Sequence, residues 1–304
     1  MESDSEHQVR RIVMSNPKYS VVVVHGIGAG TGKEREGFSK DLKAGVVKCN
    51  PECETLWFEA PWEGNNDSVD TVVKEIAGEL LDSYIRDAED EKKRTEQWAA
   101  EQDTSSRWWI LRTIKKIYVG LKRGISGATP DALRKAKQIA PNVLDVVLDL
   151  PIYLGHHGQD IRKAVFKKID EAMSKEVDGV VLVGHSLGSV IAFDVLLEEL
   201  KNQNEPRIKA LVTMGSPLEW VAKIRRAMDN IAEAPAFDVH GTKWINYYDP
   251  QDPVPLRRAL NRDIFNEVEN VEEVSKKALI DAHCAYWKSQ MIAQRVVDLM
   301  CGIL

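Results

Sequence analysis

The stretch VLVGHSLGSVIAFDVL, residues 181–196, changes its pattern halfway along, and that change decides the fold. Its first part continues a short run of β-branched residues, which is typical of a buried strand. Its second part is apolar over a longer segment, as expected of a buried helix. Between the two stands GHSLG at residues 184–188, which has the pattern G-x-S-x-G. We therefore predict a sharp turn from strand to helix that lifts the Ser186 hydroxyl clear of the sheet.

Short apolar runs alternate with amphipathic stretches along the rest of the chain, which favours a mainly parallel sheet flanked by helices on both faces. The runs that predict strands are residues 19–25, 55–60, 179–185, 208–215, 243–249 and, with a weaker pattern, 264–269. The patterns that predict helices are roughly residues 34–48, 67–100, 158–176, 187–202, 217–232 and 284–301. The predicted fold class is therefore α/β.

A long interval between residues 64 and 156 interrupts this alternation. It is far longer than an ordinary crossover connection and contains no clear strand, so we predict a large helical cap inserted on the sheet. The predicted organisation is an α/β core of residues 1–63 and 157–304 that carries a cap or lid of residues 64–156.

The bulk composition argues against several classes of function. A net charge of −6 gives no support to nucleic-acid binding, which usually needs a basic surface. The polar, acidic N-terminal segment does not resemble a signal peptide, and no apolar run is long enough to span a membrane, so we predict a cytoplasmic protein. Its four cysteines include no second pair at zinc spacing, which predicts reduced thiols and no metal site.

A glycine-rich turn follows the first apolar run in VVVVHGIGAGTGKE, residues 21–34, and raises the question of nucleotide binding. A P-loop with this ending would need glycine in place of Ile27 and serine or threonine in place of Glu34. The dinucleotide pattern G-x-G-x-x-G fails in every register, because its last position falls on Thr31, Lys33 or Arg35. This turn is therefore predicted to serve something other than a nucleotide.

With these motifs in this order, the chain resembles the α/β-hydrolase superfamily, on its lipase and carboxylesterase side. The resemblance covers roughly residues 20–60 and 178–301 and rests on HGIG (25–28), GHSLG (184–188), MGSPL (214–218), NYYDPQDPVP (246–255) and His283 followed by Tyr286 and Trp287. It implies the hydrolase fold, serine-ester chemistry and no cofactor. There are two departures from the family pattern. The first two strands of the family's sheet are expected to be absent, and the insertion matches no family cap, which leaves the substrate open.

In this family the nucleophilic serine is followed along the chain by an acid and then by a histidine. Ser186 would be the nucleophile, and only His240 and His283 come after it. Because His240 precedes the strand that must carry the acid, we predict that His283 is the base, in a loop leading to the final helix. The acid is Asp252 or Asp249. The sequence DPVP resembles the acid loop of many lipases, which favours Asp252.

Acyl transfer passes through a tetrahedral oxyanion, which needs one backbone N–H after the nucleophile and one from the loop after the early strand. Leu187 would supply the first donor of this oxyanion hole, and Ile27 the second. The glycines at positions 26 and 28 would let that loop approach the substrate closely. The glycine-rich turn is thus predicted to hold a transient anion on carbon rather than a phosphate.

The predicted cap contains RWWILRTIKKIYVGLKRG, residues 107–124, whose apolar and basic side chains separate onto opposite faces of a helix. With Trp108 and Trp109 beside it, this helix is a candidate for peripheral contact with a membrane. The alternative is an ordinary cap helix that packs its apolar face on the core.

Together, these residues predict a serine hydrolase that cleaves carboxylic esters, with an acyl or lipid-like substrate, through an acyl-enzyme intermediate. Thioesters, amides or transfer to an alcohol would use the same groups, and the sequence does not separate them. The alternative from another class is a catalytically silent, hydrolase-like module that docks on membranes or on a protein partner. A complete triad in the right order argues against that alternative.

Overall fold

The computed structural model describes residues 16–26, 35–60, 150, 153–154, 158–219, 221–222, 225, 236–252, 254–277 and 280–303. Nearly all of the predicted cap lies outside the described residues, as do its amphipathic segment 107–124 and the predicted oxyanion donor Ile27. What the structure describes is thus almost entirely the predicted α/β core.

Six parallel strands form one sheet in the order β2-β1-β3-β4-β5-β6. From β1 the chain runs outward to β2 at one edge, and it then returns to the other side of β1 to build β3 through β6. The direction of winding therefore reverses between β1 and β3, and ligands of open α/β sheets bind at such a switch point, beyond the carboxyl ends of the strands. The strands are β1 (Tyr19–Val24), β2 (Trp57–Ala60), β3 (Gly179–His185), β4 (Ile208–Met214), β5 (Lys243–Tyr248) and β6 (Val268–Glu272).

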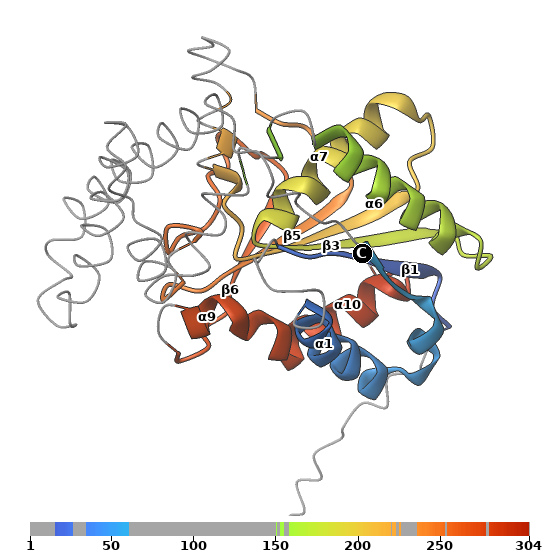
Figure 1. Ribbon diagram of the computed structural model, residues 1–304, viewed down its shortest axis with the longest axis horizontal. Coiled ribbons are helices and arrows are strands. Elements are labelled where there is room, and N and C mark those ends of the chain that lie inside the picture. Colours follow the sequence, from blue (N-terminus) through green and yellow to red (C-terminus); the bar gives the residue numbers. More distant parts are fainter. Residues whose placement is uncertain are drawn as a thin grey trace, which may run out of the picture.

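Helices cover both faces of this sheet and bury a core on each side (Figure 1). Alternate valines of β1 point into the two cores, Val22 and Val24 into one and Val21 and Val23 into the other. Burial on both faces explains why this strand is a continuous apolar run rather than an alternating one. The helices are α6 (Gly158–Met173) and α7 (Leu187–Asn202) on the first face, with α1 (Arg35–Cys49) and α10 (Gln290–Met300) on the second.

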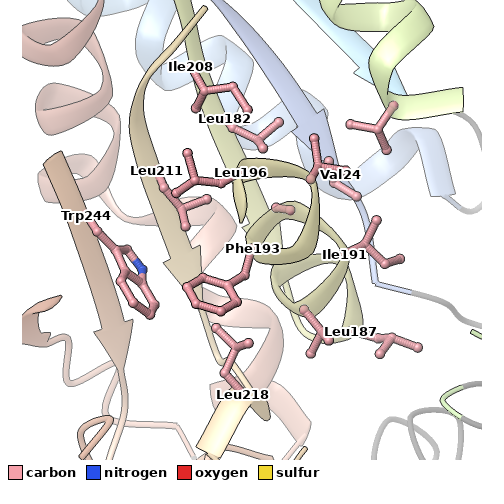
Figure 2. Close-up of a cluster of buried hydrophobic side chains, with 14 of the residues drawn as sticks. Val24, Leu182, Leu187, Ile191, Phe193, Leu196, Ile208, Leu211, Leu218 and Trp244 are labelled. Carbon is pink, nitrogen blue, oxygen red and sulfur yellow. The ribbon is translucent and has the colours of Figure 1, made fainter. Parts of the chain in front are cut away.

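The first core surrounds α7, the helix that begins directly after Ser186. Figure 2 shows Leu196 of this helix next to Leu182 and Leu211 of the sheet, and Phe193 beside Trp244 of β5. From residue 187 to residue 196, every side chain of the helix except that of Asp194 is buried. Such a helix cannot shift without opening the core, so the packing fixes the position of its first turn.

Three predicted elements differ from those observed. The strand predicted over residues 55–60 begins at Trp57, because a 3₁₀ helix (Pro51–Leu56) occupies the preceding residues. The last strand begins at Val268 rather than at residue 264, because Phe265 turns its ring into an aromatic cluster and makes only an isolated bridge to Phe237. The last predicted helix, 284–301, is broken before Gln290, where the Ser289 hydroxyl accepts a hydrogen bond from the backbone N–H of Ile292 and caps a new helix. The helix α9 (Ile280–Ala285) and a 3₁₀ turn (Tyr286–Lys288) precede this break. The prediction that His283 lies in a loop is therefore wrong, since it lies in α9.

In the described part of the chain no strand comes before β1, and β2 forms the edge of the sheet on that side. Within the same residues, none of the helices combines the length and the apolar character needed to cross a membrane.

Candidate active site

Ser186 lies in a strained turn between β3 and α7. Its backbone has φ 55° and ψ −131°, a conformation that few residues other than glycine adopt and that typically costs about 1–3 kcal/mol. The turn is held by a hydrogen bond from Ser186 N–H to the carbonyl of Met214 at 3.0 Å, and the Ser186 side chain does not cap the helix. A Cβ at Gly188 would lie 2.2 Å from the carbonyl oxygen of Val24, so only glycine allows this close crossing of β1. The predicted turn from strand to helix is therefore present at this serine.

His283 and Asp252 form a buried hydrogen-bonded pair. His283 Nδ1 donates to Asp252 Oδ2 at 2.8 Å, and the two side chains are 3% and 0% exposed. The second carboxylate oxygen, Oδ1, accepts the backbone N–H of Val254 at 2.9 Å. Hydrogen bonds to both oxygens fix the carboxylate plane and stabilise its charged form, while a donor on Nδ1 leaves Nε2 free to take a proton.

Asp249, the other candidate acid, makes a different set of contacts. Its carboxylate accepts the backbone N–H of Gln251 at 2.7 Å and both the backbone N–H and the hydroxyl of Ser275, at 2.8 and 2.6 Å. These bonds close the turn after β5 and tie it to the segment that follows β6. The geometry therefore favours Asp252 as the partner of His283 and gives Asp249 a role in capping the turn.

Gly215, directly after β4, lies under the His283–Asp252 pair. It has φ +55°, and a Cβ added there would lie 2.8 Å from Asp252 Oδ2 and 2.9 Å from His283 Nδ1. Its neighbour Met214 accepts the hydrogen bond from Ser186 N–H. The residues Met214 and Gly215 thus connect the serine turn with the His–Asp pair. The sequence motif MGSPL was noted as part of the resemblance, but nothing in its pattern assigned this spacer role.

His185, the second residue of GHSLG, is part of the site although sequence reasoning gave it no role. Its Nε2–H donates to the backbone carbonyl of His283 at 2.8 Å, and the two rings are 4.6 Å apart between centroids. Burial, and then the proximity of His283, hold the pKa of His185 well below its usual value, so this imidazole is neutral. His185 therefore anchors α9 at His283 without adding a charge. Its position next to the serine was the one available signal.

A second histidine–carboxylate contact lies where β1 ends. His25 Nε2 is 3.4 Å from Glu59 Oε2, and the other Glu59 oxygen accepts hydrogen bonds from the hydroxyl of Ser39 and, at 3.4 Å, from the Trp57 indole. Partial burial opposes the charge on Glu59, but the hydrogen bonds from His25 and Ser39 outweigh it and hold the pKa of Glu59 at about 2. This network fixes the end of β1 directly before Gly26.

Gly26 passes directly beside Ser186, since a Cβ added to it would lie 2.7 Å from Ser186 Cβ and 3.3 Å from Ser186 Oγ. Leu187, the first predicted oxyanion donor, begins α7 next to the serine and is buried. Ile27, the second, lies outside the described residues. His240, which was set aside as a base, is exposed and lies 3.6 Å from Asp238 rather than near either candidate acid.

The described segments contain no group of three histidine, cysteine or acidic side chains placed to hold a metal ion. None of the four cysteines, which all lie in the described residues, forms a disulfide bond. What the described site assembles is therefore a strained serine beside a glycine-rich strand end, together with a buried imidazole–carboxylate pair, all at the carboxyl edge of the sheet and next to its switch point.

Comparison with known proteins adds two similarities. The model of the lecithin:cholesterol acyltransferase family matches residues 162–230, a segment that includes Ser186 and ends before Asp252 and His283. A curated protein of Saccharomyces cerevisiae, named as a probable mitochondrial phospholipase, is 30% identical over 155 residues. That alignment covers 50% of this chain and 20% of the length of the yeast protein.

Proposed function

Because the chain is a lipase-like member of the α/β-hydrolase superfamily, we propose that it cleaves carboxylic esters of lipids with Ser186 as the nucleophile. The observation that carries the proposal is the buried 2.8 Å hydrogen bond between His283 and Asp252, at the same edge of the sheet as Ser186. A serine hydroxyl is a weak nucleophile near neutral pH, and an oriented imidazole is the group that activates it.

In the proposed reaction, Ser186 Oγ attacks the ester carbonyl carbon while His283 Nε2 takes the hydroxyl proton. Asp252 keeps the imidazole in the required tautomer and stabilises the imidazolium that forms. The alcohol departs with the proton from His283, which leaves the acyl group bound to Ser186. Water then attacks this ester with His283 again as base, and the carboxylic acid leaves.

The negative charge that develops on the carbonyl oxygen needs donors close to Ser186. We assign one to the backbone N–H of Leu187, in the first turn of α7, where the helix dipole also favours an anion. We assign the other to Ile27, supported by the close passage of the preceding residue, Gly26, beside the serine. The network around Glu59 would keep that strand end in place.

The substrate class is inferred from the relatives. The matching family is named for lecithin and cholesterol and the yeast protein for phospholipids, which supports a lipid ester rather than a small soluble ester. The same acyl-enzyme can pass its acyl group to water or to an alcohol, so the broad class is a lipid hydrolase or acyltransferase. No described feature supports the alternative of a silent docking module, and the segment 107–124 on which membrane contact would depend lies outside the described residues.

The experiment is a chain-length series of p-nitrophenyl esters, followed by phosphatidylcholine in mixed micelles with fatty acid release as the readout. The variants Ser186→Ala and His283→Ala should each lose about 10⁴-fold or more in kcat while remaining folded. The matched control is His240→Ala, which removes an exposed histidine and should leave the rate within about twofold of wild type. Turnover that survives Ser186→Ala would overturn the proposal.

A further inference from the structure

The turn after β5 holds two fully buried aspartates three residues apart, and one side chain bridges them. Tyr286 donates its hydroxyl hydrogen to Asp252 Oδ2 at 2.9 Å and accepts the backbone N–H of Asp249 at 2.8 Å. We propose that Tyr286 is a positioning residue for the reaction, whose hydroxyl holds the Asp252 carboxylate against His283. This inference rests on the roles proposed above for Ser186, His283 and Asp252.

The direction of the hydrogen bond from Tyr286 is fixed by its surroundings. The backbone N–H of Asp249 can only donate, so it occupies the acceptor side of the phenol oxygen. The one phenol hydrogen is then left for Asp252, whose carboxylate can only accept when ionised. Tyr286 is 1% exposed, and burial together with the nearby Asp252 raises its pKa well above the usual value. The phenol therefore stays a donor at every pH at which the reaction would run.

The Asp252 carboxylate thus has three donors, and two of them share one oxygen. Oδ2 accepts from both His283 Nδ1 and Tyr286 Oη, while Oδ1 accepts from the backbone N–H of Val254. A phenol that donates to Oδ2 disperses the negative charge that faces the imidazole. The carboxylate then orients His283 while part of its own charge is taken up by the phenol hydrogen. Phenylalanine would fill the same space and leave this charge undispersed.

Within the residues that the structure describes, titratable groups face His283 from two neighbouring elements, and others share its helix. Asp252 faces it from the turn after β5, and His185 faces it from the end of β3 as a neutral ring. Cys284 and Asp281 share its helix, and Asp281 is exposed. Asp252 is the charged group that is hydrogen-bonded to the imidazole, so a change in the hydrogen bonds of this carboxylate should be detectable at His283.

The test compares Tyr286→Phe with wild type in the whole chain. The expected result is a kcat/KM about tenfold lower at its plateau, because the carboxylate is less firmly held. The acidic limb of the pH profile should also move to higher pH by about one unit, because the undispersed carboxylate stabilises the imidazolium. If Tyr286 had only a structural role, Tyr286→Phe would lower the stability of the protein and leave the acidic limb at its wild-type pH.

The chain offers a matched control in Tyr153, which is also buried and donates to a carboxylate, Asp194, at 2.5 Å. Arg225 holds Asp194 independently, so the loss of the phenol leaves that carboxylate paired. Tyr153→Phe should lower the melting temperature by an amount similar to Tyr286→Phe and keep the wild-type pH profile. The inference would be overturned if the acidic limb of the pH profile stayed in place in Tyr286→Phe, or if it moved equally in both variants.

A second measurement does not depend on turnover. Titration of the His283 imidazole by ¹⁵N NMR, assigned by its loss in His283→Gln, should give a higher pKa in Tyr286→Phe than in wild type. If wild type turns over no ester and the titration still shifts, the proposed function fails while the role of Tyr286 toward Asp252 stands. Should the phenylalanine variant not fold, Tyr286→3-fluorotyrosine introduces a more acidic phenol and should shift the pKa downward. An unchanged or raised pKa there would contradict the inference.

Discussion

Gly215→Ala tests the arrangement of the site without removing any reacting group. The added Cβ would lie 2.8 Å from Asp252 Oδ2 and 2.9 Å from His283 Nδ1, whereas ordinary contact begins near 3.4 Å. The pair must therefore retreat by about 0.6 Å (3.4 minus 2.8). Neither group can swing away easily, because both side chains are buried, the other oxygen of Asp252 accepts the backbone N–H of Val254, and the backbone carbonyl of His283 accepts a hydrogen bond from His185.

Two costs follow from this substitution. The first is the positive φ of +55°, which costs an alanine about 1–2 kcal/mol of stability. The second is displacement of the His283–Asp252 pair relative to Ser186. A misplacement of about 1 Å can cost a hundredfold in rate, so a shift of roughly half that size should cost on the order of ten- to thirtyfold in kcat/KM.

Gly241→Ala separates the two costs. Gly241 has φ +75°, and a Cβ added there would meet nothing within 4 Å. It should lose a similar 1–2 kcal/mol in urea unfolding, by the same backbone penalty of about that size, and keep the wild-type rate. The assay is kcat/KM on the best ester together with urea unfolding of both variants. Wild-type activity in Gly215→Ala, or equal losses of activity in the two variants, would refute the reasoning.

Two further predictions concern acidic residues near the site. Asp252→Asn should lower kcat by about 10⁴-fold, because the amide cannot hold His283 in the required tautomer. Asp249→Asn should instead lower the free energy of unfolding by about 1–2 kcal/mol, because its carboxylate accepts three hydrogen bonds, one from Gln251 and two from Ser275. Its activity should stay within about tenfold of wild type. If steady-state kinetics gave the large loss to Asp249→Asn and the small loss to Asp252→Asn, Asp249 would be the acid. For Glu59, folding lowers the pKa from 4.5 to about 2, so its charge stabilises the protein above pH 4.5 and that contribution is lost as the pH falls toward 2. The side chain is 34% exposed, so urea unfolding should show Glu59→Gln less stable than wild type by about 1 kcal/mol at pH 5, with the gap reduced to about half at pH 3 and closing toward pH 2. An equal gap at pH 5 and pH 3 would contradict this.

Much of the fold could be predicted because its signals are local. The α/β class is confirmed by the all-parallel sheet, and the strand runs around residues 19–25, 179–185 and 208–215 lie within one residue of the observed bounds. A strand buried on both faces is a continuous apolar run, and this signal depends on no distant partner. The turn at Ser186 was equally readable, because glycines on both sides of a serine at a strand–helix junction form one short pattern.

The differences arise where distant contacts decide the structure. Phe265 has the composition of a strand residue, but its ring packs against Phe237 and Trp244, so pairing with β5 starts only at Val268. The residues on both sides of His283 have a helical pattern. The helix nevertheless ends before Gln290, because the Ser289 hydroxyl accepts the backbone N–H of Ile292 and caps a new helix there.

The supporting residues of the site were beyond sequence reasoning. Tyr286 and His185 act through hydrogen bonds to residues 34 and 98 positions away, and no spacing in the chain reveals such contacts. The choice between Asp252 and Asp249 had the same difficulty. Both aspartates follow β5, and the direction of each carboxylate depends on how the turn packs against the segments after β6 and in α9.

The most direct test of the central claim is labelling with a fluorophosphonate probe, wild type beside Ser186→Ala, followed by mass spectrometry of the modified peptide. The probe reacts with a serine only where a base has activated it. Our account predicts one adduct on Ser186 in the wild-type protein and none in the folded Ser186→Ala variant. Equal labelling of both proteins, or a folded wild type that stays unlabelled with and without lipid vesicles, would contradict it.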